Sequence, residues 1–138
     1  PQVQFNDSLD FSFSGVKTSV INMVHNFTQK DNPVPVEDIA ASFQQAVCEV
    51  LADRLEACAK KANVKNIALA GGVASNTLLR KLCKERAERQ GLGFYCPPPV
   101  LCTDNAVMIA ARAYFDFIKG KFGGLDLNAI ANLDIAKM

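Results

Sequence analysis

The chain has 138 residues, of which 49% are hydrophobic and 21% are charged. This length and composition are typical of one globular domain with a sizeable core, and they exclude a disordered chain. The formal net charge of +1 gives no general attraction for nucleic acid, so such a contact would require a local basic patch. Apolar runs all fall well short of the roughly 20 residues of a transmembrane helix, so we expect no membrane association.

Cysteine and histidine residues are too few and too scattered for a common metal or disulfide framework. The chain has five cysteines, an odd number without any C-x-x-C spacing, and a single histidine, His25. These counts argue against a cysteine-rich zinc site and against disulfide pairing. We therefore predict reduced, buried thiols in a cytoplasmic protein. The five cysteines are Cys48, Cys58, Cys83, Cys96 and Cys102.

The N-terminal part is predicted to contain a short strand and two helices. Residues 11–14 alternate large apolar and small polar side chains, which favours a strand, and Ser14 can then cap a helix over residues 15–29. After a loop, Pro35 suits the start of a longer helix over residues 36–63. Its apolar residues recur at steps of three and four, which predicts one core-facing stripe. They are Ile39, Phe43, Val47, Val50, Leu51, Leu55 and Cys58.

A glycine pair stands near the middle of the chain. The apolar residues 67–70 predict a buried strand, Gly71 and Gly72 break it, and a helical pattern runs from about Ser75 to about Gln90. Free backbone N–H groups and the positive end of a helix would then face one point, which suits a phosphate or another anion. A plain tight turn between a strand and a helix explains the same residues without a ligand.

The helix after the glycine pair has mixed charge. Its three leucines, Leu78, Leu79 and Leu82, are predicted to point inward. Its basic side chains are predicted to point mostly outward and are interleaved with Glu85 and Glu88. This pattern is compatible with a solvated face or with a patch that binds the RNA backbone. The basic residues are Arg80, Lys81, Lys84, Arg86 and Arg89.

A second strand-to-helix junction follows. Residues 93–96 predict a short strand, and the prolines of residues 97–99 force an extended connection. A helix then runs to about Lys119, with Thr103 or Asp104 as its cap. The tail after this helix is expected to fold back over the surface through Leu125, Leu127, Ile130 and Leu133.

The two junctions supply the candidate functional residues. If both strands lie in one parallel sheet, both junctions fall at its carboxyl edge, where ligands of open α/β sheets bind. Asn76 would offer an amide there and Asp104 a carboxylate. A carboxylate beside a phosphate is repulsive unless a metal ion lies between them, so a divalent cation is expected. The alternative is that Asp104 is only a helix cap.

Four blocks of sequence can be compared with known families as a set. They are Asp10–Thr18, Ile39–Gln44, Ala70–Asn76 followed by Leu79-Arg80, and Cys102–Ala110. Together they closely resemble the TsaD family, the tRNA adenosine threonylcarbamoyltransferases once named O-sialoglycoprotein endopeptidases or glycoproteases. The blocks occur in the family's order and span nearly the whole chain, and the first has the form of the bacterial branch.

The resemblance implies an α/β fold of the actin-like ATPase class, which is RNase H-like and sugar kinase-like. Residues 1–122 would form its C-terminal lobe, truncated at the N-terminal side, and residues 123–138 a tail that packs on the lobe. The family transfers threonylcarbamoyl from threonylcarbamoyl-AMP to the adenosine next to the anticodon in tRNAs that read ANN codons. The resemblance also implies TsaB-like and TsaE-like partner proteins.

The resemblance also implies roles for four residues of this chain. Gly71 and Gly72 would shape the pocket for the nucleotide, Asn76 would contact it, and Asp104 would be a catalytic ligand of a single divalent metal ion, iron or zinc. The family takes two more metal ligands from a His-x-x-x-His motif, which this sequence lacks. We therefore expect that this piece alone is inactive and metal-free, and that it self-associates through an exposed sheet edge.

Three other functions are compatible with parts of this sequence. The older family name implies a metallopeptidase, but the sequence has no H-E-x-x-H motif. The fold class also contains carbohydrate and acetate kinases, which the four blocks do not favour. A fragment without activity of its own could instead act as an interaction module.

Overall fold

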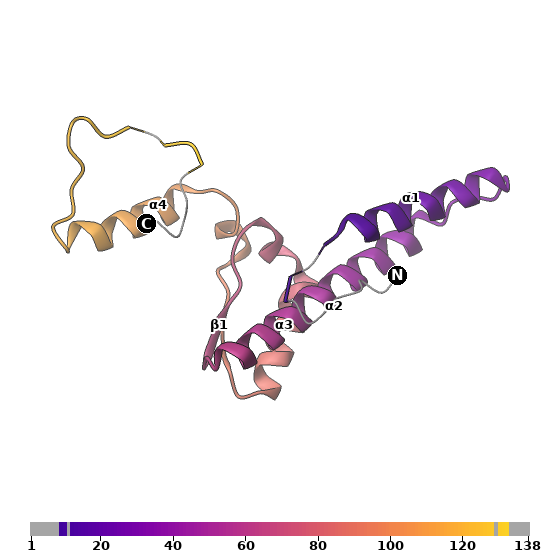
Figure 1. The fold of residues 1–138 in the computed structure, drawn as a ribbon, viewed down its shortest axis with the longest axis horizontal. Coiled ribbons are helices and arrows are strands. Elements are labelled where there is room, and N and C mark those ends of the chain that lie inside the picture. The colour runs from indigo at the N-terminus through magenta and orange to yellow at the C-terminus, as the bar shows by residue number, and fades with distance from the viewer. Residues whose placement is uncertain (1–8, 11, 129, 133–138) are drawn as a thin grey trace. The chain divides into compact units, whose positions relative to one another are not determined.

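The computed structural model describes residues 9–10, 12–128 and 130–132, and the chain divides into two compact units (Figure 1). The first unit comprises residues 1–103 and the second residues 104–138. The elements of the first unit are α1 (Ser14–Gln29), α2 (Val36–Ala62), β1 (Asn66–Ala68), the 3-10 helix η1 (Gly72–Ser75), α3 (Thr77–Arg89), β2 (Gly93–Tyr95) and the 3-10 helix η2 (Pro99–Leu101). The second unit contains α4 (Ala106–Phe117).

Helix α1 begins one residue earlier than the sequence predicted. Ser14 is its first residue rather than its cap, and its backbone N–H donates to the hydroxyl of Ser12 at 3.4 Å. The strand predicted over residues 11–14 is not formed at Ser12 or Phe13, while Phe11 lies outside the described residues. Val16 is the buried residue of this helix. An early helix start therefore replaces the second half of the predicted strand.

Helix α2 matches its predicted bounds to within one residue. It starts after Pro35 and ends at Ala62, and the next residue, Asn63, has the left-handed conformation with φ of 49° that commonly follows a helix. The core-facing positions are smaller than predicted. Cys48, Ala52 and Ala59 are the buried residues, whereas Phe43 of the predicted stripe is 42% exposed. Small side chains let another helix approach closely, which is why they occupy the contact line.

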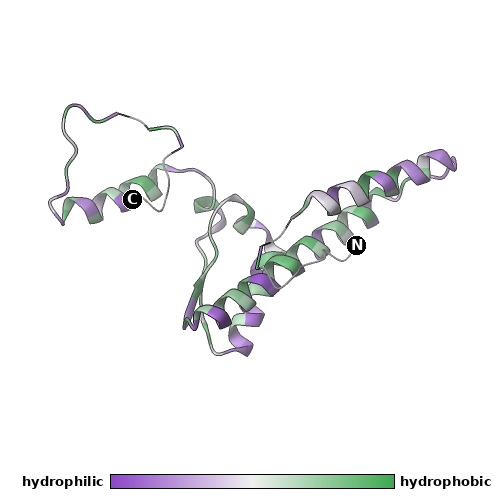
Figure 2. Ribbon diagram, in the orientation of Figure 1, coloured by the Kyte–Doolittle hydropathy of each residue, from purple (hydrophilic) through white to green (hydrophobic). Residues whose placement is uncertain are grey.

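The two strands form a parallel pair that is connected through α3. Asn66 aligns with Gly93 and Ala68 with Tyr95, and the N–H of Leu69 extends the ladder by donating to the carbonyl of Tyr95 at 2.9 Å. The first unit is therefore of mixed α/β type, as predicted. The segment between the strands contains α3 and is long enough for the crossover that parallel strands require. Hydrophobic residues of α2, α3 and the strands pack into two adjoining clusters. Figure 2 shows hydrophobic positions in green along these elements. Their buried members are Cys48, Ala52, Leu79 and Cys83 in one, and Ala59, Ile67 and Ala87 in the other.

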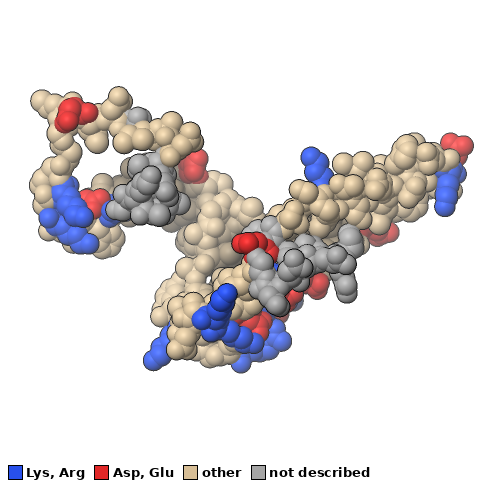
Figure 3. Space-filling model, in the orientation of Figure 1, with Lys and Arg blue, Asp and Glu red and all other residues tan. Residues whose placement is uncertain are grey.

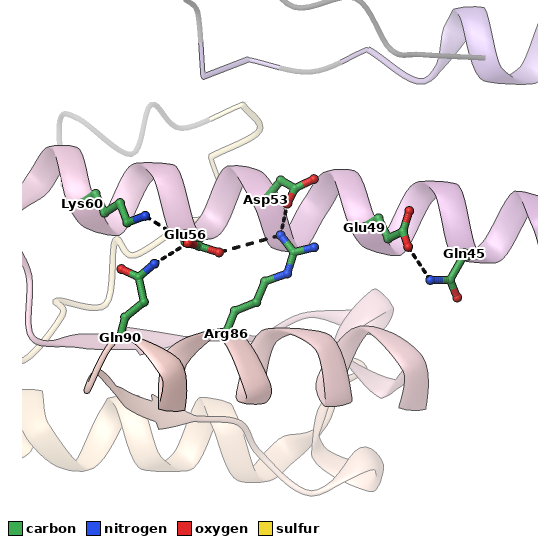
Figure 4. Close-up of polar contacts among 7 residues, drawn as sticks. All are labelled: Gln45, Glu49, Asp53, Glu56, Lys60, Arg86 and Gln90. Carbon is green, nitrogen blue, oxygen red and sulfur yellow. Dashed lines mark hydrogen bonds and ion pairs between the residues drawn. The ribbon is translucent and has the colours of Figure 1, made fainter.

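A polar cluster, which we call the α2–α3 latch, joins the two helices beside this core (Figure 4). The Arg86 guanidinium of α3 is bonded to Asp53 and lies 3.9 Å from a carboxylate oxygen of Glu56, both on α2. Gln90 also donates to Glu56, which pairs with Lys60 at 3.1 Å. The Arg86 side chain is only 15% exposed, so the prediction that it points outward is wrong.

The second unit contains a helix whose apolar side chains are exposed. Helix α4 ends at Phe117, two residues before the predicted end. The tail residues Leu125, Leu127 and Ile130 are also exposed, Leu133 lies outside the described residues, and the packing of the tail on the lobe stays a prediction. Helices within the described ranges are all too short or too polar to cross a bilayer.

Candidate functional site

The junction after β1 is shaped by a conformation that glycine alone adopts easily. Gly71 has φ of 89° and ψ of 172°, a region of backbone space that is essentially restricted to glycine. Its carbonyl accepts a hydrogen bond from the N–H of Ala74 at 2.9 Å, which closes the turn. The prediction that the strand ends before this glycine pair is confirmed, and the positive φ of Gly71 is the physical cause of the turn.

Gly72 leaves the same turn open to its surroundings. It does not have a positive φ, and a Cβ atom added to either glycine would meet none of the described residues within 4 Å. The carbonyl of Gly72 accepts from the Ser75 hydroxyl at 2.7 Å. A ligand can therefore approach the backbone of this glycine pair without displacing a side chain.

The α-helix starts further from the glycine pair than the sequence predicted. One turn of 3-10 helix, η1, separates the glycines from α3, which starts at Thr77. The carboxamide oxygen of Asn76 caps α3 by accepting from the N–H of Leu79 at 3.0 Å, so one free amide of the helix end is already satisfied. The accessible backbone at this junction therefore belongs to the two glycines, and η1 separates them from the start of α3.

Asn76 is held by three contacts. Besides capping α3, its Oδ1 accepts from the Cys48 thiol at 3.7 Å, and its Nδ2 donates to Oε1 of Gln44 at 3.2 Å. A carboxamide nitrogen carries two N–H groups, so a second donor remains beyond the bond to Gln44. The sequence identified Asn76 but missed Gln44, because the two residues are 32 positions apart and only the packing of α2 on α3 joins them.

Arg80 joins three loop segments around this junction. Its guanidinium donates to the carbonyl of Ala74 in η1, to the carbonyl of Pro97 at 2.6 Å and to the sulfur of Cys102 at 2.9 Å. Cys102 is only 5% exposed. Arg80 was predicted to point outward, and this prediction is wrong because the connection after β2 covers that side of α3. Its inclusion in the third sequence block was the one sign of a special role.

The remaining basic residues of α3 form a mixed-charge surface. With Arg80 and Arg86 engaged in internal contacts, Lys81 and Lys84 pair with glutamates one turn later on the helix at 4.0 and 3.8 Å. Figure 3 shows acidic side chains among the basic ones on this part of the first unit. This pairing favours the solvated-face interpretation over a dedicated RNA patch.

Asp104 opens the second unit. The cap of α4 is Asn105, whose side-chain oxygen accepts from the N–H of Met108 at 3.0 Å, so the prediction of Thr103 or Asp104 as the cap is wrong. The exposed carboxylate of Asp104 is consequently not needed to cap the helix. The shared cleft predicted for Asn76 and Asp104 stays a prediction, because they belong to different units.

The described residues do not form a metal site by themselves. No cluster of three or more His, Cys, Asp or Glu side chains that could hold an ion occurs among the described residues. A structural or catalytic transition-metal site normally needs at least three protein ligands. Asp104 can therefore serve as a metal ligand only together with ligands from elsewhere.

Two buried thiols of the core have raised pKa values, and one of them, Cys48, contacts Asn76. Burial raises the pKa of Cys48 above 9.0, partly offset by a hydrogen bond to the backbone of Leu79. Burial likewise raises the pKa of Cys83, against the opposing charge of Arg86. A protonated Cys48 is the form that can donate to Asn76, so the pKa shift and the hydrogen bond agree.

Comparison with known proteins identifies the family. The model of the family described as "TsaD: tRNA N6-adenosine threonylcarbamoyltransferase" matches residues 1–111. Proteins named tRNA N6-adenosine threonylcarbamoyltransferase from Clostridium novyi (strain NT) and Clostridium botulinum (strain Kyoto / Type A2) are each 45% identical over 139 residues. The protein of the same name from Clostridium kluyveri (strain NBRC 12016) is 46% identical over 140 residues. These alignments cover 99% of this chain and 41% of each relative, so the chain spans less than half the length of the curated relatives it matches. The chain belongs to the TsaD family.

Proposed function

We propose that this chain forms the C-terminal part of an enzyme that modifies tRNA. The enzyme transfers threonylcarbamoyl from threonylcarbamoyl-AMP to the exocyclic amine of the adenosine next to the anticodon in tRNAs that read ANN codons. The observation that supports this most directly is the family match over residues 1–111, together with 45% identity to proteins named for this activity.

Residues 1–122 act as the C-terminal lobe of an actin-like ATPase fold, and residues 123–138 form its tail. The parallel β1–β2 pair with α2 and α3 packed against it supports an α/β lobe of this kind. In such a fold the active site lies between two lobes, and ligands bind at the carboxyl edge of the sheet. The glycine pair follows β1 at this edge and therefore lies where a nucleotide would bind.

The glycine pair and Asn76 bind the nucleotide part of threonylcarbamoyl-AMP or another adenine nucleotide. The open backbone of Gly71 and Gly72 lets a phosphate or ribose approach closely. The second N–H of Asn76 can donate to a ligand oxygen while its oxygen continues to cap α3. The role of these residues is to bind and orient the intermediate, which places its carbonyl in line with the attacking amine.

The complete enzyme holds one divalent metal ion, iron or zinc, with Asp104 as a catalytic ligand. A bound metal ion would polarise the carbonyl and neutralise charge as AMP leaves. Its other ligands are a His-x-x-x-His pair outside this chain, a proposal that agrees with the lack of a complete ligand cluster among the described residues. The chain therefore works only with the rest of the enzyme. By family resemblance, we place this enzyme in the cytoplasm, with TsaB-like and TsaE-like proteins as its partners.

The test measures threonylcarbamoyladenosine in tRNA by mass spectrometry of its nucleosides. Deleting the parent gene should remove the modified nucleoside, and restoring the complete protein should return it. The 138-residue chain alone should not restore it and should contain no stoichiometric iron or zinc by elemental analysis. Retention of the nucleoside after deletion would refute the proposed activity, whereas rescue by the chain alone would refute only its dependence on the rest of the protein.

A further inference from the structure

We propose that Gln44 of α2 is a positioning residue that orients the Asn76 carboxamide toward the nucleotide. The inference rests on the proposed function, because it assigns the direction of a donor at the same site. Its basis is the hydrogen bond of 3.2 Å from Nδ2 of Asn76 to Oε1 of Gln44. Neither the sequence pattern nor the core packing assigns a role to Gln44, which is exposed.

The contacts determine which end of the Asn76 carboxamide is the oxygen. The backbone N–H of Leu79 can only donate, so the atom facing it at 3.0 Å must be the oxygen of Asn76. The Cys48 thiol approaches the same oxygen at 3.7 Å. The nitrogen must then face Gln44, which in turn presents its own oxygen. The orientations of the Asn76 and Gln44 carboxamides therefore both follow from the backbone N–H of Leu79, which can only donate.

Gln44 determines where the remaining donor of Asn76 points. The two N–H groups of a carboxamide lie in one plane at a fixed angle, so engaging one of them fixes the direction of the other. Gln44 and Cys48 are one helical turn apart on α2 and therefore lie on the same face. This face contacts both ends of the Asn76 side chain, leaving the second N–H directed away from Gln44.

The neighbouring residue provides a matched control. Gln45 is the same residue type on the same helix and is also exposed, but its Nε2 bonds to Glu49 one turn further on (Figure 4). Replacing Gln45 removes a surface hydrogen bond of α2 that does not involve Asn76. A general effect of α2 stability would appear in both positions, whereas a positioning effect appears only at Gln44.

The experiment compares variants of the complete enzyme in steady-state assays with threonylcarbamoyl-AMP and tRNA, together with thermal unfolding. Gln44→Leu lacks an acceptor and should raise KM for threonylcarbamoyl-AMP about fivefold to tenfold, which corresponds to the loss of one hydrogen bond. Gln44→Lys keeps a long polar side chain but offers only donors, so it should behave like Gln44→Leu. Gln44→Glu restores an acceptor but adds a negative charge that repels the phosphate, whereas Gln44→Lys adds an attractive charge without an acceptor, so a lower KM in Gln44→Glu than in Gln44→Lys is expected only if the acceptor matters. Gln45→Leu should change neither KM nor Tm.

The outcomes separate this inference from the proposed function. Asn76→Asp keeps the cap oxygen of α3 but removes both N–H donors, so it tests the nucleotide role of Asn76 directly. An unchanged KM in Asn76→Asp would refute that role. A raised KM in Asn76→Asp with no difference between Gln44→Leu and Gln45→Leu would overturn the positioning role alone. A higher KM in Gln44→Glu than in Gln44→Lys would also overturn it, because charge and not the acceptor would then determine the KM.

Discussion

At the scale of single residues, the two glycines of the β1–η1 junction have different jobs. Gly71 is required by its backbone, with φ of 89°, whereas Gly72 is not constrained in this way and has open space around its Cα. Gly71→Ala should therefore destabilise the fold by about 1–3 kcal/mol. Gly72→Ala should leave stability unchanged or raise it by up to about 1 kcal/mol.

The same pair of variants separates folding from binding. If the nucleotide packs against the bare backbone, Gly72→Ala should weaken its binding in the complete enzyme despite normal stability. Urea unfolding measures the effect on stability, and nucleotide titration measures the effect on binding. Equal stability of Gly71→Ala and Gly72→Ala would contradict the assignment of strain to Gly71.

The buried thiol of Cys83 should make the free energy of unfolding fall as the pH rises into the alkaline range. Burial raises its pKa above the ordinary value of 9.0, so the folded state binds the proton more tightly than the unfolded state. Its contribution is fully present below pH 9.0 and is lost as the pH rises through the higher folded pKa. Cys83→Ala should flatten the decline of unfolding free energy above pH 9, whereas Cys58→Ala, at an exposed thiol, should retain it.

At the scale of elements, the α2–α3 latch should measurably stabilise the first unit. Arg86→Met keeps the length of the side chain but removes its contacts with Asp53 and Glu56. Because Arg86 is mostly buried but Asp53 is 65% exposed, we expect a loss of about 1–2 kcal/mol in urea unfolding. Lys84→Met on the same helix removes an exposed pair with Glu88 and should change stability by less than about 0.5 kcal/mol. Similar losses in both variants would show that the latch adds nothing beyond a surface ion pair.

Periodicity in the sequence predicted the main helices and both strands, but not how they touch. The bounds of α2 follow from Pro35 and from the end of its apolar pattern, which are local features. The 3-10 turn η1 was missed because glycine predicts a break without specifying what fills it. Arg80 and Arg86 were assigned to the surface because a helix pattern assumes one inner face, whereas the connection after β2 covers α3 at Arg80 and carboxylates of α2 bind Arg86.

The candidate site was predictable to a similar degree. Gly71 was identified by its position after a strand, and the structure explains it by a local backbone angle. Asn76 was identified as well, but its bonds to Gln44 and Cys48 cross from one helix to another. Contacts between residues so far apart in sequence depend on tertiary packing, which no local pattern encodes.

At the scale of the whole molecule, helix α4 of the second unit has an exposed apolar surface. Its charged residues are Arg112 and Asp116, which pair with each other at 3.1 Å, and its large apolar residues occupy all sides of the helix. A helix that is hydrophobic all round is normally buried. The exposed apolar residues of α4 and the residues that directly follow it include Val107, Met108, Ile109, Tyr114, Phe115, Phe117, Ile118 and Phe122. We therefore expect other parts of the complete enzyme to cover α4.

The isolated chain should then self-associate through α4, since exposed apolar surface of this extent drives association. Light scattering during size-exclusion chromatography should show a mass that rises with protein concentration. Ile109→Lys on α4 should shift the chain toward the monomer, whereas Ile21→Lys should not, although Ile21 on α1 is 56% exposed and Ile109 is 65% exposed. The reverse result would place the association on the apolar groove between α1 and α2, which is lined by Val20, Ile21 and Phe43 among others. A monomer at every concentration would mean that α4 is already covered within the chain itself.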